Sequence, residues 1–149
     1  MKLVIQRVLN AEVKVSEKVV GAIDNGLLVL MGIEKEDGPD DVVWLVNKLI
    51  NLRIFNDQSG VMNESLIATE GNLLVISQFT LMASTKKGNR PSYTQAAGHE
   101  IAIPLYEMFV TKAEEKLNKK VARGVFGADM KVELLNDGPV TIVIDSKNR

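Results

Sequence analysis

The continuous apolar run Leu27-Leu28-Val29-Leu30-Met31-Gly32-Ile33 constrains the fold of this chain more than any other feature of its sequence. It is much shorter than the roughly 20 residues of a membrane span. An unbroken apolar run of this length is typical of a strand that is covered on both faces. A second buried strand is predicted at residues 72–81, ending in Ser77-Gln78-Phe79-Thr80. Two such strands require a sheet with other elements packed against it.

Alternating apolar and polar residues predict more strands on either side of this pair. The predicted strands cover residues 3–8, 11–15, 19–23, 131–135 and 140–145, with a hairpin turn at Ser16-Glu17-Lys18 and a tight connection at Asn136-Asp137-Gly138-Pro139. Two amphipathic helices are predicted at residues 39–52 and 101–119, the first begun by a capping Asp37 and by Pro39 in its first turn. The fold class is therefore α/β: a single domain, residues 1–149, of mixed and antiparallel β-sheet layers with two main helices packed on one side.

The composition excludes several classes of site. The chain has no cysteine and one histidine, His99, which leaves too few soft ligands for zinc. We expect neither a metal nor another cofactor. The formal net charge of −1 differs from the strongly basic footprint of proteins that wrap nucleic acid, so DNA is not an expected partner and any RNA contact should be local. The first residues lack a signal-peptide apolar segment, and we expect a cytoplasmic protein without membrane contact.

The end of the second buried strand is the first candidate site, because polar groups converge at strand ends in α/β folds. Ser77 and Thr80 can simply satisfy backbone groups there while Phe79 fills the core. Alternatively, one hydroxyl is a nucleophile, or successive backbone N–H groups form an oxyanion hole. A hydroxyl nucleophile needs a nearby base, and His99 is expected in a polar loop without a partner. The oxyanion hole needs no such base.

Gly138-Pro139 is the second candidate. An ordinary trans turn is the simpler expectation, since only about 5–6% of X–Pro bonds in folded proteins are cis. A cis bond would instead present two carbonyl groups in nearly the same direction, which suits the rejection of a chemical group by steric contact.

An exposed loop at residues 83–93 is the third candidate, because it carries Lys86, Lys87 and Arg90 directly after the strand that ends at Thr80. Solvated surface is the ordinary explanation for such side chains. Their position nevertheless puts positive charge near any site at residues 77–80, where it would suit a phosphodiester.

Five motifs in register resemble the D-aminoacyl-tRNA deacylase family over essentially the whole chain. They are Ile5-Gln6-Arg7-Val8, Leu52-Arg53-Ile54-Phe55, Val75-Ile76-Ser77-Gln78-Phe79-Thr80-Leu81, Arg90-Pro91-Ser92 and Asn136-Asp137-Gly138-Pro139-Val140-Thr141. The resemblance implies an enzyme that hydrolyses the ester between a D-amino acid and the 3′ end of tRNA and rejects L-aminoacyl-tRNA. Two departures, Tyr93 and Val140 where relatives carry Phe, concern only the fine shape of the site.

The resemblance also implies how the residues are used. The protein is expected to be a homodimer in which Ser77, Gln78, Phe79 and Thr80 line the subunit's own catalytic site. Gly138 and Pro139, joined by a cis bond, would enter the partner's site, with Arg7 supporting them and with Lys86, Lys87 and Arg90 as tRNA contacts. A backbone wedge would leave no room for an L side chain, while D side chains would point outward and glycyl-tRNA would also be accepted.

Two other classes of function are weighed against this one. The cluster of Lys86, Lys87 and Arg90 also fits a non-catalytic nucleic-acid-binding module, which would bind without ester turnover. The second class is an amidase or esterase with Thr80 as its nucleophile. Replacement of Thr80 by Val tests that role, because it removes the hydroxyl at similar volume.

Overall fold

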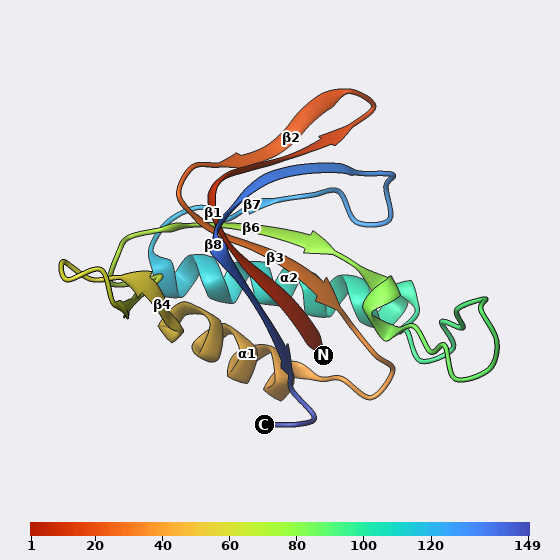
Figure 1. The fold of residues 1–149 in the computed structure, drawn as a ribbon. Coiled ribbons are helices and arrows are strands. Elements are labelled where there is room, and N and C mark those ends of the chain that lie inside the picture. The colour runs from red at the N-terminus through yellow and green to blue at the C-terminus, as the bar shows by residue number, and fades with distance from the viewer.

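A computed structural model describes the chain from residue 1 to residue 149 (Figure 1). In chain order its elements are β1 (Lys2–Val15), β2 (Lys18–Ile23), β3 (Gly26–Gly32), α1 (Pro39–Asn51), β4 (Arg53–Asn56), β5 (Met62–Ser65), β6 (Asn72–Ser77), the 3-10 helix η1 (Phe79–Met82), α2 (His99–Leu117), β7 (Ala122–Arg123) and β8 (Lys131–Asp145). Most strands and both long helices follow the predicted periodicities.

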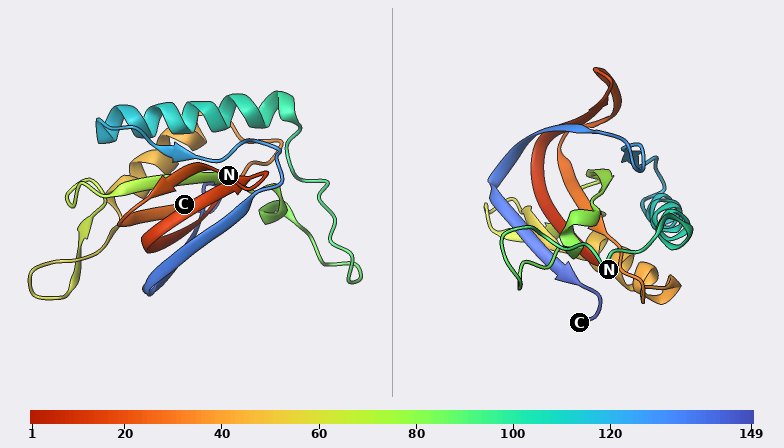
Figure 2. Two further views of the ribbon diagram at one scale, coloured as in Figure 1. Left: turned by 90° about the horizontal axis from the view of Figure 1, so that it is seen from above. Right: turned by 90° about the vertical axis from the view of Figure 1, so that its right-hand side faces the viewer.

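The long strand β1 organises the sheet because it pairs with three other strands. It pairs antiparallel with β2 and β3 along one edge and with β8 along the other. β3 pairs parallel with β6, which pairs parallel with the short β7. The result is a mixed six-stranded sheet, accompanied by a separate two-stranded ribbon of β4 and β5. Figure 2 shows that the sheet curls strongly, so that its layers are parts of one continuous sheet.

Helices α1 and α2 lie together on one side of the curled sheet (Figures 1 and 2). Their apolar faces bury Leu45, Leu49 and Phe109 against Val29 and Val75 of the two central strands, and all five side chains are inaccessible to solvent. Complete burial of such a side chain contributes about 1.5–3 kcal/mol. The predicted α/β fold, with two main helices on one side of mixed sheet, is therefore confirmed.

Several predicted boundaries were wrong. Residues 3–8 and 11–15 are not two strands, because β1 continues through Leu9 and Asn10, where only its register against β8 shifts, between Val8 and Asn10. The second helix begins at His99 rather than at Ile101. The hairpin turn at Ser16 and Glu17 is confirmed, and both residues have positive φ. No helix has the length and apolar character needed to cross a membrane.

Asp37 does not cap α1, although the sequence predicted that it would. Its buried carboxylate instead accepts hydrogen bonds from the amino group of Met1, at 2.5 Å, and from the N–H of Glu34, at 2.7 Å. Gly38 takes the capping position, and its N–H donates to the carboxylate of Asp41 at 3.0 Å. A buried ammonium group needs a counter-charge, and this need outweighs the capping preference of Asp37.

Candidate active site

The strand β6 ends at Ser77, earlier than the predicted residue 81, and this shorter strand shapes the candidate site. The N–H of Gln78 donates to the carbonyl of Met31 on β3 at 2.7 Å. After that bond the chain leaves the sheet and turns into η1. The first N–H groups of a helix have no acceptor within it, and those of Phe79 and Thr80 make no bond to a loop or turn. These two donors, rather than the N–H of Gln78, can form an oxyanion hole.

The hydroxyl of Thr80 lacks the surroundings of a nucleophile. Its hydrogen bond is to the side-chain amide of Gln78, whose Nε2 donates to Thr80 Oγ1 at 2.5 Å. An amide is not a general base, and no histidine or carboxylate contacts the hydroxyl. The arrangement therefore favours backbone donors over covalent catalysis.

A cavity of about 550 Å³ opens beside the end of β6. Ser77, Gln78 and Phe79 line it, whereas Thr80 does not. Its other walls are mostly apolar or small. They come from β6, the end of β3, the segment that leads into α2 with the first turn of α2, and the segment that leads into β8 with the start of β8: Met31, Ile33, Ile76, Ala96, Ala97, Gly98, His99, Ala102, Phe126, Gly127, Ala128, Asp129, Met130 and Val132. A pocket of this size and lining can hold a nucleoside-sized ligand.

Two wall residues were missed by the sequence analysis, His99 and Asp129. His99 lies at the first turn of α2, not in a loop, and its ring meets that of Phe126 edge-on with centroids 5.7 Å apart. Asp129 is exposed, and its carboxylate accepts hydrogen bonds from Lys131. The apolar periodicity of the helix does not reach back to His99, which is polar and exposed, and no motif marks Asp129.

The segment around Gly138-Pro139 is not a tight turn between two strands, as predicted, but an insertion within the single strand β8. Both halves of β8 pair with β1, so no hairpin is formed. The Gly138–Pro139 peptide bond is cis, and Gly138 has φ +127°. Both residues are exposed, and neither lines the cavity of its own chain.

Arg7 is buried beneath this insertion, with 6% of its surface exposed. Its Nε lies 2.9 Å from a carboxylate oxygen of Asp137 and also donates to the Asp137 carbonyl at 3.2 Å. Its Nη1 donates to the carbonyl of Ile54 on β4 at 2.6 Å. The guanidinium thus connects the insertion to the β4–β5 ribbon.

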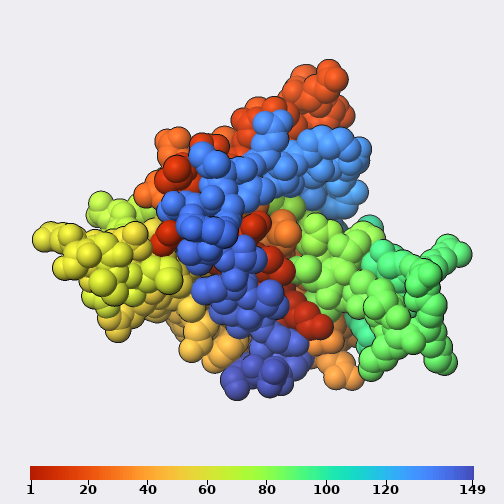
Figure 3. Space-filling view, viewed as in Figure 1, coloured from red at the N-terminus to blue at the C-terminus, as the bar shows by residue number.

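The loop 83–93 is exposed, as predicted, and projects from the body of the molecule (Figure 3). Backbone hydrogen bonds between Ser84 and Ser92 close its base. Lys86, Lys87 and Arg90 form no ion pair. The loop is held next to the candidate site, because the rings of Tyr93 and Phe79 meet edge-on at 5.0 Å.

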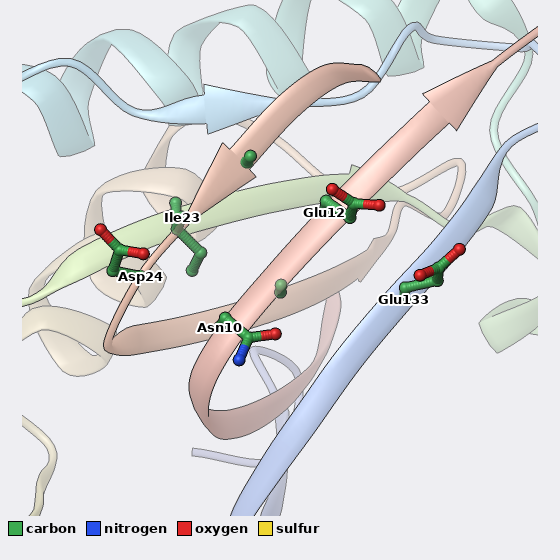
Figure 4. Close-up of a pocket in the computed structure, with 7 residues that line it drawn as sticks. Asn10, Glu12, Ile23, Asp24 and Glu133 are labelled. Carbon is green, nitrogen blue, oxygen red and sulfur yellow. The ribbon is translucent and has the colours of Figure 1, made fainter. Parts of the chain in front are cut away.

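A second hollow, of about 320 Å³, lies on the outer surface of β1, β2 and β8 (Figure 4). It displays the carboxylates of Glu12, Asp24 and Glu133. Lys14 pairs with Glu12 and Glu133 at 2.7 and 2.9 Å, and the hydrogen bond to Glu12, followed by that to Glu133, raises its pKa to about 12. The remaining negative charge repels phosphate groups, which makes the cavity beside β6 the better site for a nucleic-acid end.

Comparison with known proteins shows the family to which the sequence is similar. Residues 4–145 match a family described as D-Tyr-tRNA(Tyr) deacylase. Proteins named D-aminoacyl-tRNA deacylase from Flavobacterium psychrophilum and Bacteroides fragilis are each 59% identical, covering 100% of this chain and 99% of theirs.

Two solved structures share the fold. One, titled "c-Myc DNA Unwinding Element Binding Protein", has a TM-score of 0.91 and 38% identity and covers 97% of this chain and 98% of its own. The other, titled "Structural Analysis of a probable eukaryotic D-amino acid tRNA deacylase", has a TM-score of 0.84 at 17% identity and covers 96% and 97%. The second likeness bears on the fold alone.

Proposed function

The chain belongs to the D-Tyr-tRNA(Tyr) deacylase family, and from this premise we propose that it frees tRNA from D-amino acids through the cavity beside β6. It is a hydrolase of the D-aminoacyl-tRNA deacylase type. The assignment of the site rests on two features that lie next to each other, a pair of backbone donors and a cavity. The unpaired donors of Phe79 and Thr80 lie at the start of η1, directly after β6, and Phe79 lines the nucleoside-sized cavity that opens there.

The cavity receives the terminal adenosine, and the ester carbonyl points toward η1. Water attacks the carbonyl carbon, and the N–H groups of Phe79 and Thr80 stabilise the negative oxygen of the tetrahedral intermediate. The C–O bond to the ribose then breaks, and the ribose oxygen leaves with a proton. The neighbouring ribose hydroxyl of the substrate helps to activate the water, so the protein needs no side-chain base. The products are free tRNA and a D-amino acid.

Gly138 and Pro139 select the chirality of the substrate in the partner's cavity. Their exposure, together with their absence from the cavity of their own chain, supports an action in trans. Backbone placed close to the α-carbon excludes an L side chain, whereas a D side chain points away and is not gripped. The enzyme therefore accepts many D-amino acids, and glycine because it has no side chain to exclude.

A homodimer is required by this arrangement. The exposed apolar side chains of Leu9 on β1 and of Leu135 and Val143 on β8 support it, and Val143 has 67% of its surface accessible. Exposed apolar surface on paired strands is typical of protein–protein contacts. Pairing of two copies would cover it.

The loop 83–93 contacts the phosphates of the acceptor end. Its free cations Lys86, Lys87 and Arg90 lie next to the site through the contact between Tyr93 and Phe79. With a net charge of −1 the protein has little other attraction for nucleic acid, so the contact is local and DNA is not a partner. The reaction takes place in the cytoplasm, where aminoacyl-tRNA is used.

Hydrolysis of D-tyrosyl-tRNA and L-tyrosyl-tRNA by the purified protein, without added metal, tests the proposal. We expect the ratio of kcat/KM to exceed the roughly 10–200-fold that one methylene can provide. Duplex DNA added in excess should not inhibit. Equal rates on the two esters would refute the chirality claim, and binding of tRNA without turnover would instead indicate a nucleic-acid-binding module.

A further inference from the structure

The β1–β8 ladder is irregular at two places, on either side of Val8, and the larger irregularity lies opposite Arg7. Gln6 pairs with Thr141 and Val8 pairs with Asn136, and between these pairs β8 holds four residues where β1 holds one. The four are Asp137, Gly138, Pro139 and Val140. An ordinary β-bulge inserts a single extra residue. An insertion of this size lacks ladder bonds of its own, so other groups must fix its shape.

Asn136 supplies bonds across the base of the insertion. Its side-chain Nδ2 donates to the carbonyl of Arg7 on β1 at 3.1 Å and to the carbonyl of Val140 on β8 at 3.1 Å. An asparagine amide has two N–H donors, and both are used here. One side chain therefore joins the residue that enters the insertion to the residue that leaves it, and ties both to β1.

Asn136 is also linked to Arg7, whose side chain makes its own contact with the insertion. The carbonyl that Asn136 binds belongs to the residue whose guanidinium contacts Asp137 at 2.9 Å. The outer anchor of Arg7 is the carbonyl of Ile54, at 2.6 Å. Asn136 and Arg7 thus hold the insertion between them.

We propose that Asn136 is a positioning residue, a clasp that fixes the height and direction of Gly138 and Pro139. The inference rests on the proposed function, in which these two residues test the chirality of the ester in the partner's cavity. Steric exclusion works only if the excluding surface does not retreat. A clasp that loosens would let an L side chain push the insertion aside, while the catalytic N–H groups at η1 stay in place.

Asparagine suits this role because it is the shortest side chain that carries two donors. Aspartate has almost the same size and shape but accepts only, so two carbonyl groups would face its carboxylate without a proton between them. Asn136 is half-buried and belongs to neither apolar core cluster. Its replacement should therefore disturb the insertion more than the fold.

The variants Asn136→Asp and Asn136→Ala test the clasp, with Gln6→Ala as the matched control. Gln6 also donates a side-chain hydrogen bond across the same ladder, to Thr141 Oγ1 at 3.3 Å, but outside the insertion. We expect the D-to-L ratio of kcat/KM to fall about tenfold in the Asn136 variants, which is about 1.4 kcal/mol, mainly through faster L-ester hydrolysis. The ratio should stay within about twofold of the wild type in the control. Circular dichroism should show all three variants folded.

A second measurement does not depend on turnover. In the wild-type protein the side-chain amide protons of Asn136 should exchange slowly with solvent. The backbone NMR signal of Gly138 should broaden or split in Asn136→Asp but not in Gln6→Ala. A folded Asn136→Asp protein with the wild-type D-to-L ratio and an unchanged Gly138 signal would overturn the clasp. If the wild-type protein hydrolysed neither ester, the proposed function would fail, and the Gly138 signal alone would decide whether Asn136 holds the insertion.

Discussion

The backbone conformation of Gly138 bears directly on the proposed selectivity for D-aminoacyl esters. Its φ of +127° is unfavourable for any residue with a side chain, and an added Cβ would lie 2.8 Å from a methyl of Val140 and 3.1 Å from Nη2 of Arg7. We expect Gly138→Ala to lower the free energy of unfolding by about 1–3 kcal/mol and to reduce the D-to-L ratio of kcat/KM. Both follow from displacement of the insertion.

Gly60→Ala is the matched control for this prediction. Gly60 also has positive φ, +78°, but nothing lies within 4 Å of an added Cβ there. Thermal unfolding should show a loss of stability of about 1 kcal/mol, with the D-to-L ratio unchanged. Equal ratios in the two glycine variants would mean that Gly138 does not contribute to selectivity.

A substitution at Thr80 distinguishes covalent catalysis by its hydroxyl from catalysis by the backbone N–H groups that follow β6. Its hydroxyl is bonded to the amide of Gln78 and has no base beside it. We expect Thr80→Val to retain kcat within about tenfold of the wild type on D-tyrosyl-tRNA, because the loss of one hydrogen bond costs about 0.5–1.5 kcal/mol. A nucleophile would instead be essential, so a complete loss of single-turnover hydrolysis by the folded variant would restore the covalent mechanism.

At the scale of elements, the start of α1 is tied to the end of the chain through Asp41. Its carboxylate lies 2.9 Å from Lys147 Nζ and accepts the N–H of Gly38. Burial would raise the pKa of Asp41, but hydrogen bonds from Lys147, Ser146 and the Gly38 N–H outweigh burial and hold the pKa well below its usual range. A carboxylate with a lowered pKa stabilises the folded state at neutral pH, and this contribution is lost as the pH falls below about 4.

Asp41→Asn should therefore lower the free energy of unfolding at pH 7 by about 2 kcal/mol and have a smaller effect at pH 3. Urea unfolding at the two pH values measures both. Asp40→Asn is the control, since Asp40 is an exposed acid in the same first turn of α1. An equal loss of stability at both pH values would show that the charge of Asp41 is not what stabilises the helix start.

The elements that could be predicted from sequence are those whose signal is local. The apolar run at Leu27 predicts β3, and the periodicity after Pro39 predicts α1, each to within about one residue at either end. Both predictions succeed because the burial of a strand on two faces, or of a helix on one face, produces a pattern among residues that are close in sequence. β8 could not be predicted as one strand. Asn136-Asp137-Gly138-Pro139 has the same turn signal in a hairpin and in an insertion, and only the pairing of both halves with β1 distinguishes them.

The candidate site likewise contains residues that could be predicted from local sequence and residues that could not. Residues 77–79 were expected at a strand end, and they line the cavity. The opposite wall, from Ala96 to Ala102 and from Phe126 to Met130, consists mainly of small and apolar side chains that carry no chemical motif. What makes it a wall is the packing of α2 against the sheet, where the Tyr106 hydroxyl donates to the Val75 carbonyl at 2.9 Å. That contact spans 31 residues and leaves no local trace in the sequence.

For the whole molecule, the proposal requires that one site be built from two subunits. A direct test uses two variants that each block the site in a different way. Pro139→Trp adds bulk at the exposed tip of the insertion and should block the partner's cavity. Ala128→Trp fills the subunit's own cavity from a wall that is not part of a helix or strand. Each homodimer alone should have little activity on D-tyrosyl-tRNA.

Mixing the two variants by co-refolding or co-expression should restore activity. Half of the dimers are then hybrids, and in a symmetric dimer each hybrid holds one site with both changes and one site with neither, so about a quarter of the wild-type activity should return. Native mass spectrometry confirms the hybrids. If the site lay within one subunit, Pro139→Trp alone would remain active, or mixing would restore nothing, since every chain would keep its own defect. Recovery in the mixture can arise only if the tip of one subunit completes the cavity of the other.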